Sequence, residues 1–228
     1  MAKKQYFCVI DTETTQKGHV ADFAAVIVDR KGNIYNQCAV LLKRFYGNED
    51  LFYNPNDDSK SIWSVEGLKR RTDNYNSMIE QGTRTLATVT AVNRWLDRAA
   101  LTYPNIKLTA YNLAFDVDKC KNSGIDLTMF KEKFCLWYAF NHSIANNKKY
   151  IDFCLQNKRL TEKLNFKTDA ETAAGFITGA MLTEPHTALE DIIDFELPIL
   201  QFMLKKRKII EKPYNWRDWQ LAENVKPA

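Results

Sequence analysis

Residues 6–15 read Tyr6-Phe7-Cys8-Val9-Ile10-Asp11-Thr12-Glu13-Thr14-Thr15, an apolar run that ends in two acids. Aromatic and β-branched residues in so short a run favour a strand that is buried on both faces. Because side chains alternate along a strand, Asp11 and Glu13 are expected to project from the same side of it. Two carboxylates that close repel unless a positive charge lies between them, and a divalent cation with oxygen ligands would supply it. The stretch therefore predicts a central strand whose end holds a metal.

The Asp-x-Glu pattern is not specific on its own. It recurs at Asp169-Ala170-Glu171 and at Asp194-Phe195-Glu196, in segments of helical character. Residues two apart in a helix point to different faces, and such pairs are most often solvated surface acids. We interpret these two pairs in that way. Asp11 and Glu13 differ because a strand precedes them and because further acids follow along the chain.

Composition limits the class of protein. The chain has 228 residues, 45% of them hydrophobic, which is enough for the core of one large domain. It contains no run of 18 apolar residues and no apolar signal segment at residues 1–5, so we expect a cytoplasmic protein without a membrane span. Five scattered cysteines without a Cys-x-x-Cys pair indicate reduced thiols. A net charge of +4 and 12% aromatic residues permit a nucleic-acid partner without requiring one.

Strand and helix signals alternate along the first half of the chain, which is typical of an α/β fold. Strands are expected over 21–29 and 34–42, and the short turn between them makes them antiparallel neighbours. A long aromatic-rich loop follows over 44–62. Helices are expected over 64–81, capped by Ser64, and over 85–100, capped by Thr85. A strand over 106–111 should then lie parallel to its neighbour, since a helix connects it to the preceding strands.

The second half is expected to be mainly helical. A helix should follow Asn112, which would cap it, and a short strand should cover 134–138 before helices over 150–156 and 168–179. The last long helix should begin at Thr187, which with Glu190 fits a capping box, and Pro198 should kink or break it. Residues 205–228 are basic and carry two Trp residues, so we expect a domain over 1–204 and an extension over 205–228.

His186 is the histidine with the most informative setting among the three in the sequence. It stands just before the last long helix and five residues ahead of Asp191, which places an imidazole beside a carboxylate of the first helical turn. Asp116 lies in the first turn of the helix after Asn112 and, taken alone, fits an acid that complements the helix dipole equally well. Only the combination of these residues with Asp11 and Glu13 favours a shared site.

Taken together, three motifs resemble the DEDDh branch of the 3′–5′ exonucleases, a family that includes the proofreading epsilon subunit of bacterial DNA polymerase III and ribonuclease T. The motifs are Val9-Ile10-Asp11-Thr12-Glu13-Thr14-Thr15, Asn112-Leu113-Ala114-Phe115-Asp116 and His186-Thr187-Ala188-Leu189-Glu190-Asp191. They cover most of the chain, from Tyr6 to about Leu200. Gln16 departs from the family, in which glycine is common at this position, and the extension matches no motif of it.

The resemblance implies a ribonuclease-H-like fold, in which a mixed five-stranded sheet with an antiparallel second strand is flanked by helices. It also implies that two Mg²⁺ or Mn²⁺ ions, about 4 Å apart, lie between Asp11, Glu13, Asp116 and Asp191, with Asp11 shared. Glu13 and Asp191 would hold the ion that carries the attacking water, and Asp116 the ion beside the leaving oxygen. Neutral His186 would act as general base. The implied activity is the release of nucleoside monophosphates from single-stranded 3′ ends.

Thr12, Asn112 and Phe115 stand beside the acids and are predicted to contact the terminal sugar and base. Phe115 fits a core position under the helix equally well. DNA is slightly favoured as substrate, and a DNA polymerase is one candidate partner. Two alternatives stay open: an RNA-trimming exoribonuclease, and a non-catalytic nucleic-acid-binding or polymerase-associated module of the same fold.

Overall fold

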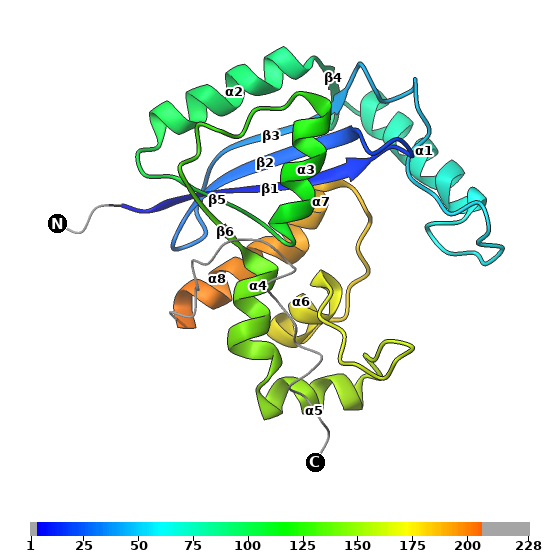
Figure 1. Cartoon of the computed structure of the whole chain (residues 1–228), viewed down its shortest axis with the longest axis vertical. Coiled ribbons are helices and arrows are strands. Elements are labelled where there is room, and N and C mark those ends of the chain that lie inside the picture. Colours follow the sequence, from blue (N-terminus) through cyan, green and yellow to red (C-terminus); the bar gives the residue numbers. More distant parts are fainter. Residues whose placement is uncertain (1–3, 207–228) are drawn as a thin grey trace.

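A six-stranded sheet in the order β4-β3-β2-β1-β5-β6 forms the centre of the computed structural model, which describes residues 4–206 (Figure 1). The strands are β1 (Tyr6–Thr14), β2 (Val20–Asp29), β3 (Ile34–Leu42), β4 (Thr85–Ala87), β5 (Lys107–Ala110) and β6 (Glu132–Cys135). Strand β2 runs antiparallel to both of its neighbours, whereas the β3–β4, β1–β5 and β5–β6 pairs are parallel. The predicted fold class is confirmed, with one edge strand more than expected.

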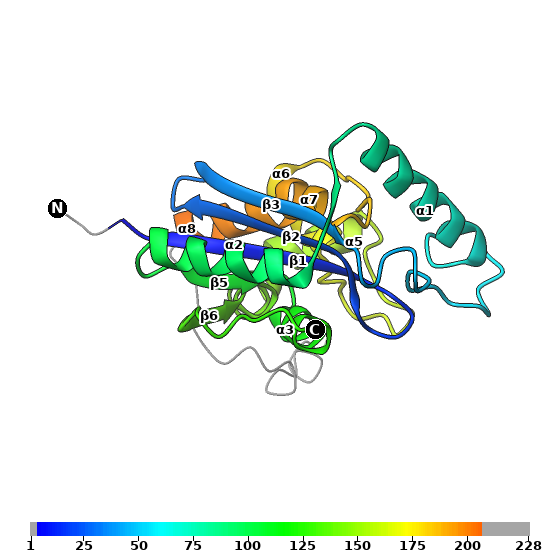
Figure 2. The ribbon, with the colours of Figure 1, turned by 90° about the horizontal axis from the view of Figure 1, so that it is seen from above.

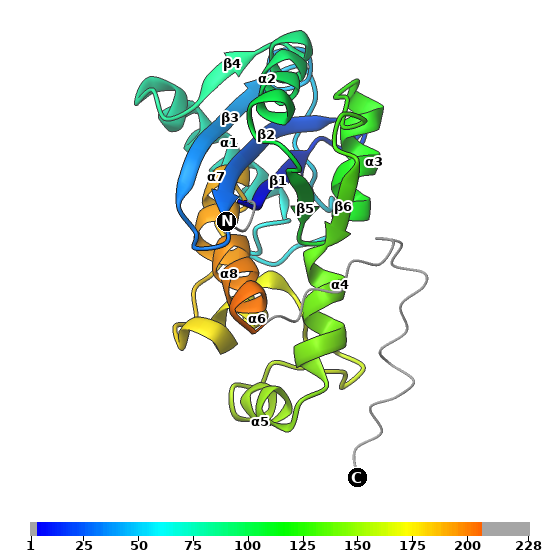
Figure 3. The ribbon, with the colours of Figure 1, turned by 90° about the vertical axis from the view of Figure 1, so that its left-hand side faces the viewer.

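Helices cover both faces of this sheet. They are α1 (Val65–Glu80), α2 (Val89–Thr102), α3 (Leu113–Ser123), α4 (Leu136–Phe140), α5 (Lys148–Gln156), α6 (Ala170–Thr178), α7 (Ala188–Asp191) and α8 (Leu197–Lys206), with π-helical turns η1 (Asn141–Ala145) and η2 (Ile192–Glu196). Helices α2 and α3 pack on one face, and α4, α6, α7 and α8 pack on the other (Figures 2 and 3). Helix α1 lies beyond the end at which β1 finishes. Among the described residues, no helix is long and apolar enough to cross a membrane.

The alternation of β1 decides which face each acid reaches. Phe7 and Val9 belong to the core beneath α4 and α8, whereas Cys8 and Ile10 belong to the core beneath α2 and α3. Continuing that alternation, Asp11 and Glu13 project toward α7 and α8, and Thr12 projects toward α3. The strand is buried on both faces along Phe7–Ile10, as its composition predicts.

The helix predicted over 85–100 starts later than expected, so its predicted cap at Thr85 is wrong. Residues 85–87 form β4 instead, paired in parallel with the end of β3. Thr88 caps α2 in place of Thr85, because its hydroxyl accepts the amide of Ala91 at 3.2 Å. Leu86, which the predicted helix would have included, is 50% exposed on the edge strand. Pairing with β3 therefore outweighs the extra helical turn that Thr85 would have started.

Two other predicted boundaries also shift. The strand expected over 134–138 ends at Cys135, whose sulfur accepts the amide of Tyr138 at 3.4 Å and so starts α4. The last helix continues through Pro198 without a break, but its winding changes to the π-helical turn η2 just before the proline. Proline has no amide proton and crowds the carbonyl four residues earlier, which gives a local cause for that change.

The remaining local predictions can be compared directly. Ser64 caps α1, accepting the amide of Gly67 at 3.1 Å, and residues 44–62 form no helix or extended strand, as expected. The capping box is wrong: Thr187 is the N-cap residue, but its hydroxyl donates to Glu190 Oε2 at 2.7 Å and caps no amide. Of the extension predicted over 205–228, Lys205 and Lys206 end α8, and the rest lies outside the described residues.

Candidate active site

One cavity of about 480 Å³ lies where the end of β1 meets the starts of α3 and α7. Its walls include every residue predicted to be catalytic, namely Asp11, Glu13, Asp116, His186 and Asp191. The three residues predicted to contact substrate, Thr12, Asn112 and Phe115, line the same cavity. Residues that are far apart in the sequence are thus brought to one place, and their chemical roles stay predictions.

Asp116 reaches this cavity because α3 begins directly after β5. Strand β5 lies parallel to β1, with Thr109 opposite Val9, so the segment after β5 leaves the sheet beside Asp11. Asp116 then falls in the first turn of α3, where it is 1% exposed. The Thr12 hydroxyl donates to Asp116 Oδ1 at 2.8 Å. That hydroxyl proton is committed to Asp116, so a substrate could only donate to Thr12, not accept from it.

Within residues 4–206, a group of potential metal ligands is formed by Glu13, His186 and Asp191. One ligand atom from each lies within 4.8 Å of the others, and His186 Nδ1 is 3.7 Å from Glu13 Oε1. Asp191 is 6% exposed, and its Oδ1 has no hydrogen-bond partner. Buried carboxylate oxygens normally have partners, so an unpaired one marks a place for a missing ligand. A divalent cation fits the carboxylate oxygens of Glu13 and Asp191, and the His186 imidazole lies close beside them.

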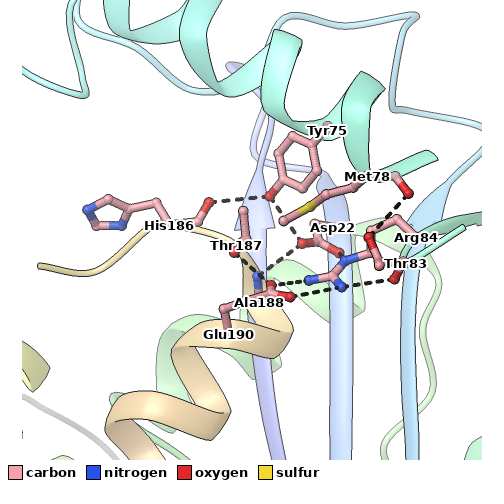
Figure 4. Close-up of polar contacts among 9 residues, drawn as sticks. All are labelled: Asp22, Tyr75, Met78, Thr83, Arg84, His186, Thr187, Ala188 and Glu190. Carbon is pink, nitrogen blue, oxygen red and sulfur yellow. Dashed lines mark hydrogen bonds and ion pairs between the residues drawn. The ribbon is translucent and has the colours of Figure 1, made fainter. Parts of the chain in front are cut away.

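The His186 backbone is held in an unusual conformation by contacts from two distant elements. Its φ of +54° is left-handed, which non-glycine residues seldom adopt. The hydroxyl of Tyr75, from α1, lies 3.3 Å from the His186 carbonyl oxygen and 3.1 Å from Asp22 Oδ2 (Figure 4). The same Asp22 oxygen accepts the amide of Ala188 at 3.0 Å, at the start of α7. These contacts fix the turn that delivers His186 to the cavity.

Arg84 completes this network, as Figure 4 shows. Its side chain is fully buried, with Nε 3.3 Å from Asp22 Oδ1, and its guanidinium also pairs with Glu190 of α7. Burial raises the pKa of Asp22 to about 6, although the charge of Arg84 and the bonds from Ala188 and Tyr75 oppose that rise. A buried ion pair is costly to break on one side only. The sheet, α1 and α7 are thereby locked together beside the cavity.

Burial and neighbouring negative charges raise the pKa values of three acids of the cavity, Asp11, Asp116 and Asp191. The pKa of Asp11 lies well above its ordinary range, first because of burial and then because of the charges of Glu196, Asp116, Asp191 and Glu13. Burial also raises the pKa of Asp116 and of Asp191, and the charge of Glu13 adds to both. Such crowding favours protonated acids unless cations balance the charge. The donor set therefore fits divalent metal ions.

Two glutamates that were not predicted from the sequence as site residues, Glu184 and Glu196, also line the cavity. Glu196, interpreted from the sequence as a surface acid, is only 3% exposed, so that interpretation is wrong; its neighbour Asp194 is exposed, as expected. Glu184 stands two residues before His186, and burial raises its pKa to about 7, against the opposing charge of His186. Because Glu184 lies only two residues before His186, the sequence could have indicated it as a residue of the same site.

Aromatic side chains form the outer wall of the cavity. Phe52, from the loop over 44–62, and Trp63 lie with ring centroids 5.8 Å apart, and the Trp63 ring lies 4.6 Å from that of His186. Phe115 is 42% exposed, so it is not the core aromatic that the sequence also allowed. Lys119 Nζ lies 5.1 Å from the Phe115 ring centroid. The wall thus offers exposed rings and a cation beside the acids.

Comparisons with known proteins find similar solved structures, but no related sequence family. No protein-family model matches this chain, and no curated protein matches it. Similar solved structures include an ExoI/SSB-Ct complex, with a TM-score of 0.48 and 15% identity over 90% of this chain and 42% of that chain. They also include E. coli Exonuclease I in complex with a dA16 oligonucleotide, with a TM-score of 0.47 and 16% identity over 90% of this chain and 41% of that one. The chain thus spans about two fifths of the length of these two solved chains.

Proposed function

We propose that this protein is a metal-dependent 3′–5′ exonuclease that releases nucleoside monophosphates from single-stranded 3′ ends, with DNA slightly favoured over RNA. The observation that carries the proposal is the gathering of Asp11, Glu13, Asp116, Asp191 and His186 around one cavity. Burial and neighbouring charges raise the pKa values of Asp11, Asp116 and Asp191. Such a cluster is poorly suited to a structural role, because it destabilises the metal-free fold. It is well suited to hold cations beside a phosphate.

In this proposal the residues would be shared between two Mg²⁺ or Mn²⁺ ions. Glu13 and Asp191, whose ligand atoms lie together, would hold one ion, Asp116 would serve the other, and Asp11 would be shared. When bound there, such ions would polarise the scissile phosphate, lower the pKa of the attacking water and stabilise charge on the leaving 3′ oxygen. The unpaired Asp191 Oδ1 would then gain the partner that it lacks.

His186 would act as the general base. Its neutral imidazole would take a proton from water as the water oxygen bonds to the terminal phosphorus. The bond from that phosphorus to the 3′ oxygen of the preceding nucleotide would break, and that oxygen would leave with a proton from solvent. The products are a nucleoside 5′-monophosphate and a strand shortened by one nucleotide. The left-handed turn held by Tyr75 and Asp22 would keep the imidazole in place for this transfer.

The outer wall explains the proposed preference for single strands. Phe52, Trp63 and Phe115 offer faces on which unpaired bases can stack, and Lys119 offers a charge for the backbone phosphates. A base inside a duplex end is already stacked and paired, so it would have to be unpaired before its phosphate could reach the acids. Asn112 lies at the turn before α3 and is the proposed contact to the terminal sugar.

The decisive experiment follows single-stranded DNA and RNA of one sequence, labelled at either end, with and without Mg²⁺. A 5′ label should yield a ladder that shortens one nucleotide at a time, and a 3′ label should appear at once as a mononucleotide. Chelation of the metal should stop both. Early release of the 5′ label, or internal cuts, would contradict the proposal. Faster loss of RNA would favour the RNA-trimming alternative, and binding without cleavage the non-catalytic one.

A further inference from the structure

The last helix changes its winding at the candidate active site. Residues 192–196 form the π-helical turn η2, in which the amide of Leu197 donates to the carbonyl of Ile192, five residues earlier. In an α-helix, residues five apart lie about 140° from one another around the axis. In a π-helical turn, the i to i+5 bond brings them close to the same side, and such turns are frequent at functional sites. The turn thus places Glu196 on the same side as Asp191.

Glu196 is anchored beside Asp11 through one of its two oxygens. Its Oε1 accepts the amide of Tyr111 at 2.8 Å. Tyr111 lies two residues beyond Thr109, which pairs with Val9, and Asp11 lies two residues beyond Val9 on the adjacent parallel strand. Tyr111 follows the end of β5 directly and Asp11 lies near the end of β1, so both residues stand at the same edge of the sheet and line the cavity. The anchored carboxylate therefore lies at the same edge of the sheet as Asp11.

The second oxygen of Glu196 has no partner. The side chain is 3% exposed and lines the cavity, and its Oε2 forms no hydrogen bond. The charge of Glu196 is the largest charge effect on the pKa of Asp11, and the charge of Asp116 raises the pKa of Glu196 itself. A glutamine could accept the Tyr111 amide equally well without adding a charge. The anchoring bond therefore does not account for the carboxylate.

We propose that Glu196 is a fifth carboxylate of the metal centre, and that its Oε2 binds the cation shared by Asp11 and Asp116 while its Oε1 stays bonded to the Tyr111 amide. Glu196 has this role only if the cavity binds divalent cations, so the role rests on the proposed function. It adds one negative charge to the four carboxylates predicted from the sequence. This would place the extra charge beside Asp11 and Asp116, whose charges interact with that of Glu196.

The test is Mn²⁺ binding to the metal-free protein and to its Glu196→Gln variant, measured by calorimetry at neutral pH. Glutamine keeps an oxygen for the Tyr111 amide and replaces the second oxygen with a neutral amide group. We expect Mn²⁺ affinity to fall about 10- to 100-fold, and the melting temperature of the metal-free variant to rise because crowded charge is removed. Asp194→Asn, an exposed acid two residues earlier, is the matched control and should change neither value.

The outcomes separate this role from the proposed function. Equal Mn²⁺ affinity in Glu196→Gln and the unaltered protein would overturn the role of Glu196 alone, whereas an unaltered protein that binds no Mn²⁺ would overturn the proposed function. If the variant does not fold, anomalous scattering from a Mn²⁺-containing crystal of the unaltered protein decides. An ion bonded to Glu196 Oε2 supports the role, and an ion bonded to Asp11 and Asp116 but beyond bonding distance of Oε2 overturns it.

Discussion

Asp11→Asn is expected to reduce cleavage by about 10³-fold or more, and to raise the melting temperature of the metal-free protein. The loss of rate follows because a carboxylate shared by two cations contributes several kcal/mol to stabilising the transition state. The gain in stability follows because burial, and then the charges of four other acids, raise the pKa of Asp11 well above the ordinary range. Rates are measured on single-stranded DNA with Mg²⁺, and melting is followed after chelation.

The gain in stability has a defined pH dependence. A carboxyl whose pKa is raised by folding weakens the fold at pH values above its unfolded pKa, where the unfolded chain releases the proton more readily. The variant should therefore gain most near neutral pH and nothing below about pH 4, where the carboxyl is protonated in both states. Asp97→Asn, at an exposed position of α2, should leave rate and melting unchanged. A melting temperature that drops by many degrees in Asp11→Asn would show that Asp11 is a structural acid.

His186→Ala is expected to lower turnover by about 10²- to 10⁴-fold while leaving the affinity for single-stranded DNA almost unchanged. The imidazole would move a proton in the reaction, whereas the exposed rings of Phe52 and Phe115 and the charge of Lys119 would still hold the strand. Single-turnover rates and DNA binding, measured separately, distinguish the two effects. A variant that cleaves at the normal rate would show that His186 is not the base.

The same residue predicts how the rate of the unaltered protein changes with pH. Burial lowers the pKa of the His186 imidazole, but the interaction with Glu13 and the charge of Glu184 outweigh this effect. In the metal-free protein, the pKa of His186 therefore lies above its usual value. Only the neutral imidazole can accept a proton, so the rate should rise with pH through this pKa. His186→Ala should lose that rise. A flat rate between about pH 5.5 and 8 in the unaltered protein would contradict the assignment.

The parts of the fold that local patterns specify were predictable. Strand β1 follows from its apolar run, the β2–β3 pair from its short turn, and α1 from the Ser64 cap. Strand β4 was not predictable in this way, because Thr85 and Thr88 are both suitable caps and only pairing with β3, a contact distant in sequence, selects Thr88. Local preferences placed the elements, whereas long-range pairing set this boundary.

The candidate site likewise contains residues that local sequence features indicate and residues that only long-range contacts bring into place. Asp11 and Glu13 could be recognised because both their spacing and the preceding strand are local features. Arg84 gave no signal, since its partners Asp22 and Glu190 lie 62 and 106 residues away. Glu196 was missed because it was interpreted, together with Asp194, as a surface acid of a regular α-helix.

That reading failed at the π-helical turn before Pro198. The proline was a visible signal that the helix would not be regular, but its effect was expected to be a kink or a break. A proline inside an acid-bearing helix therefore indicates that residues of both an α-helical and a π-helical winding should be considered as site residues.

The most direct test of the account is an anomalous difference map from a crystal of the unaltered protein grown with Mn²⁺. The account predicts two peaks about 4 Å apart among Asp11, Glu13, Asp116 and Asp191. A map without peaks in this cavity, at Mn²⁺ concentrations that saturate binding in solution, would contradict it.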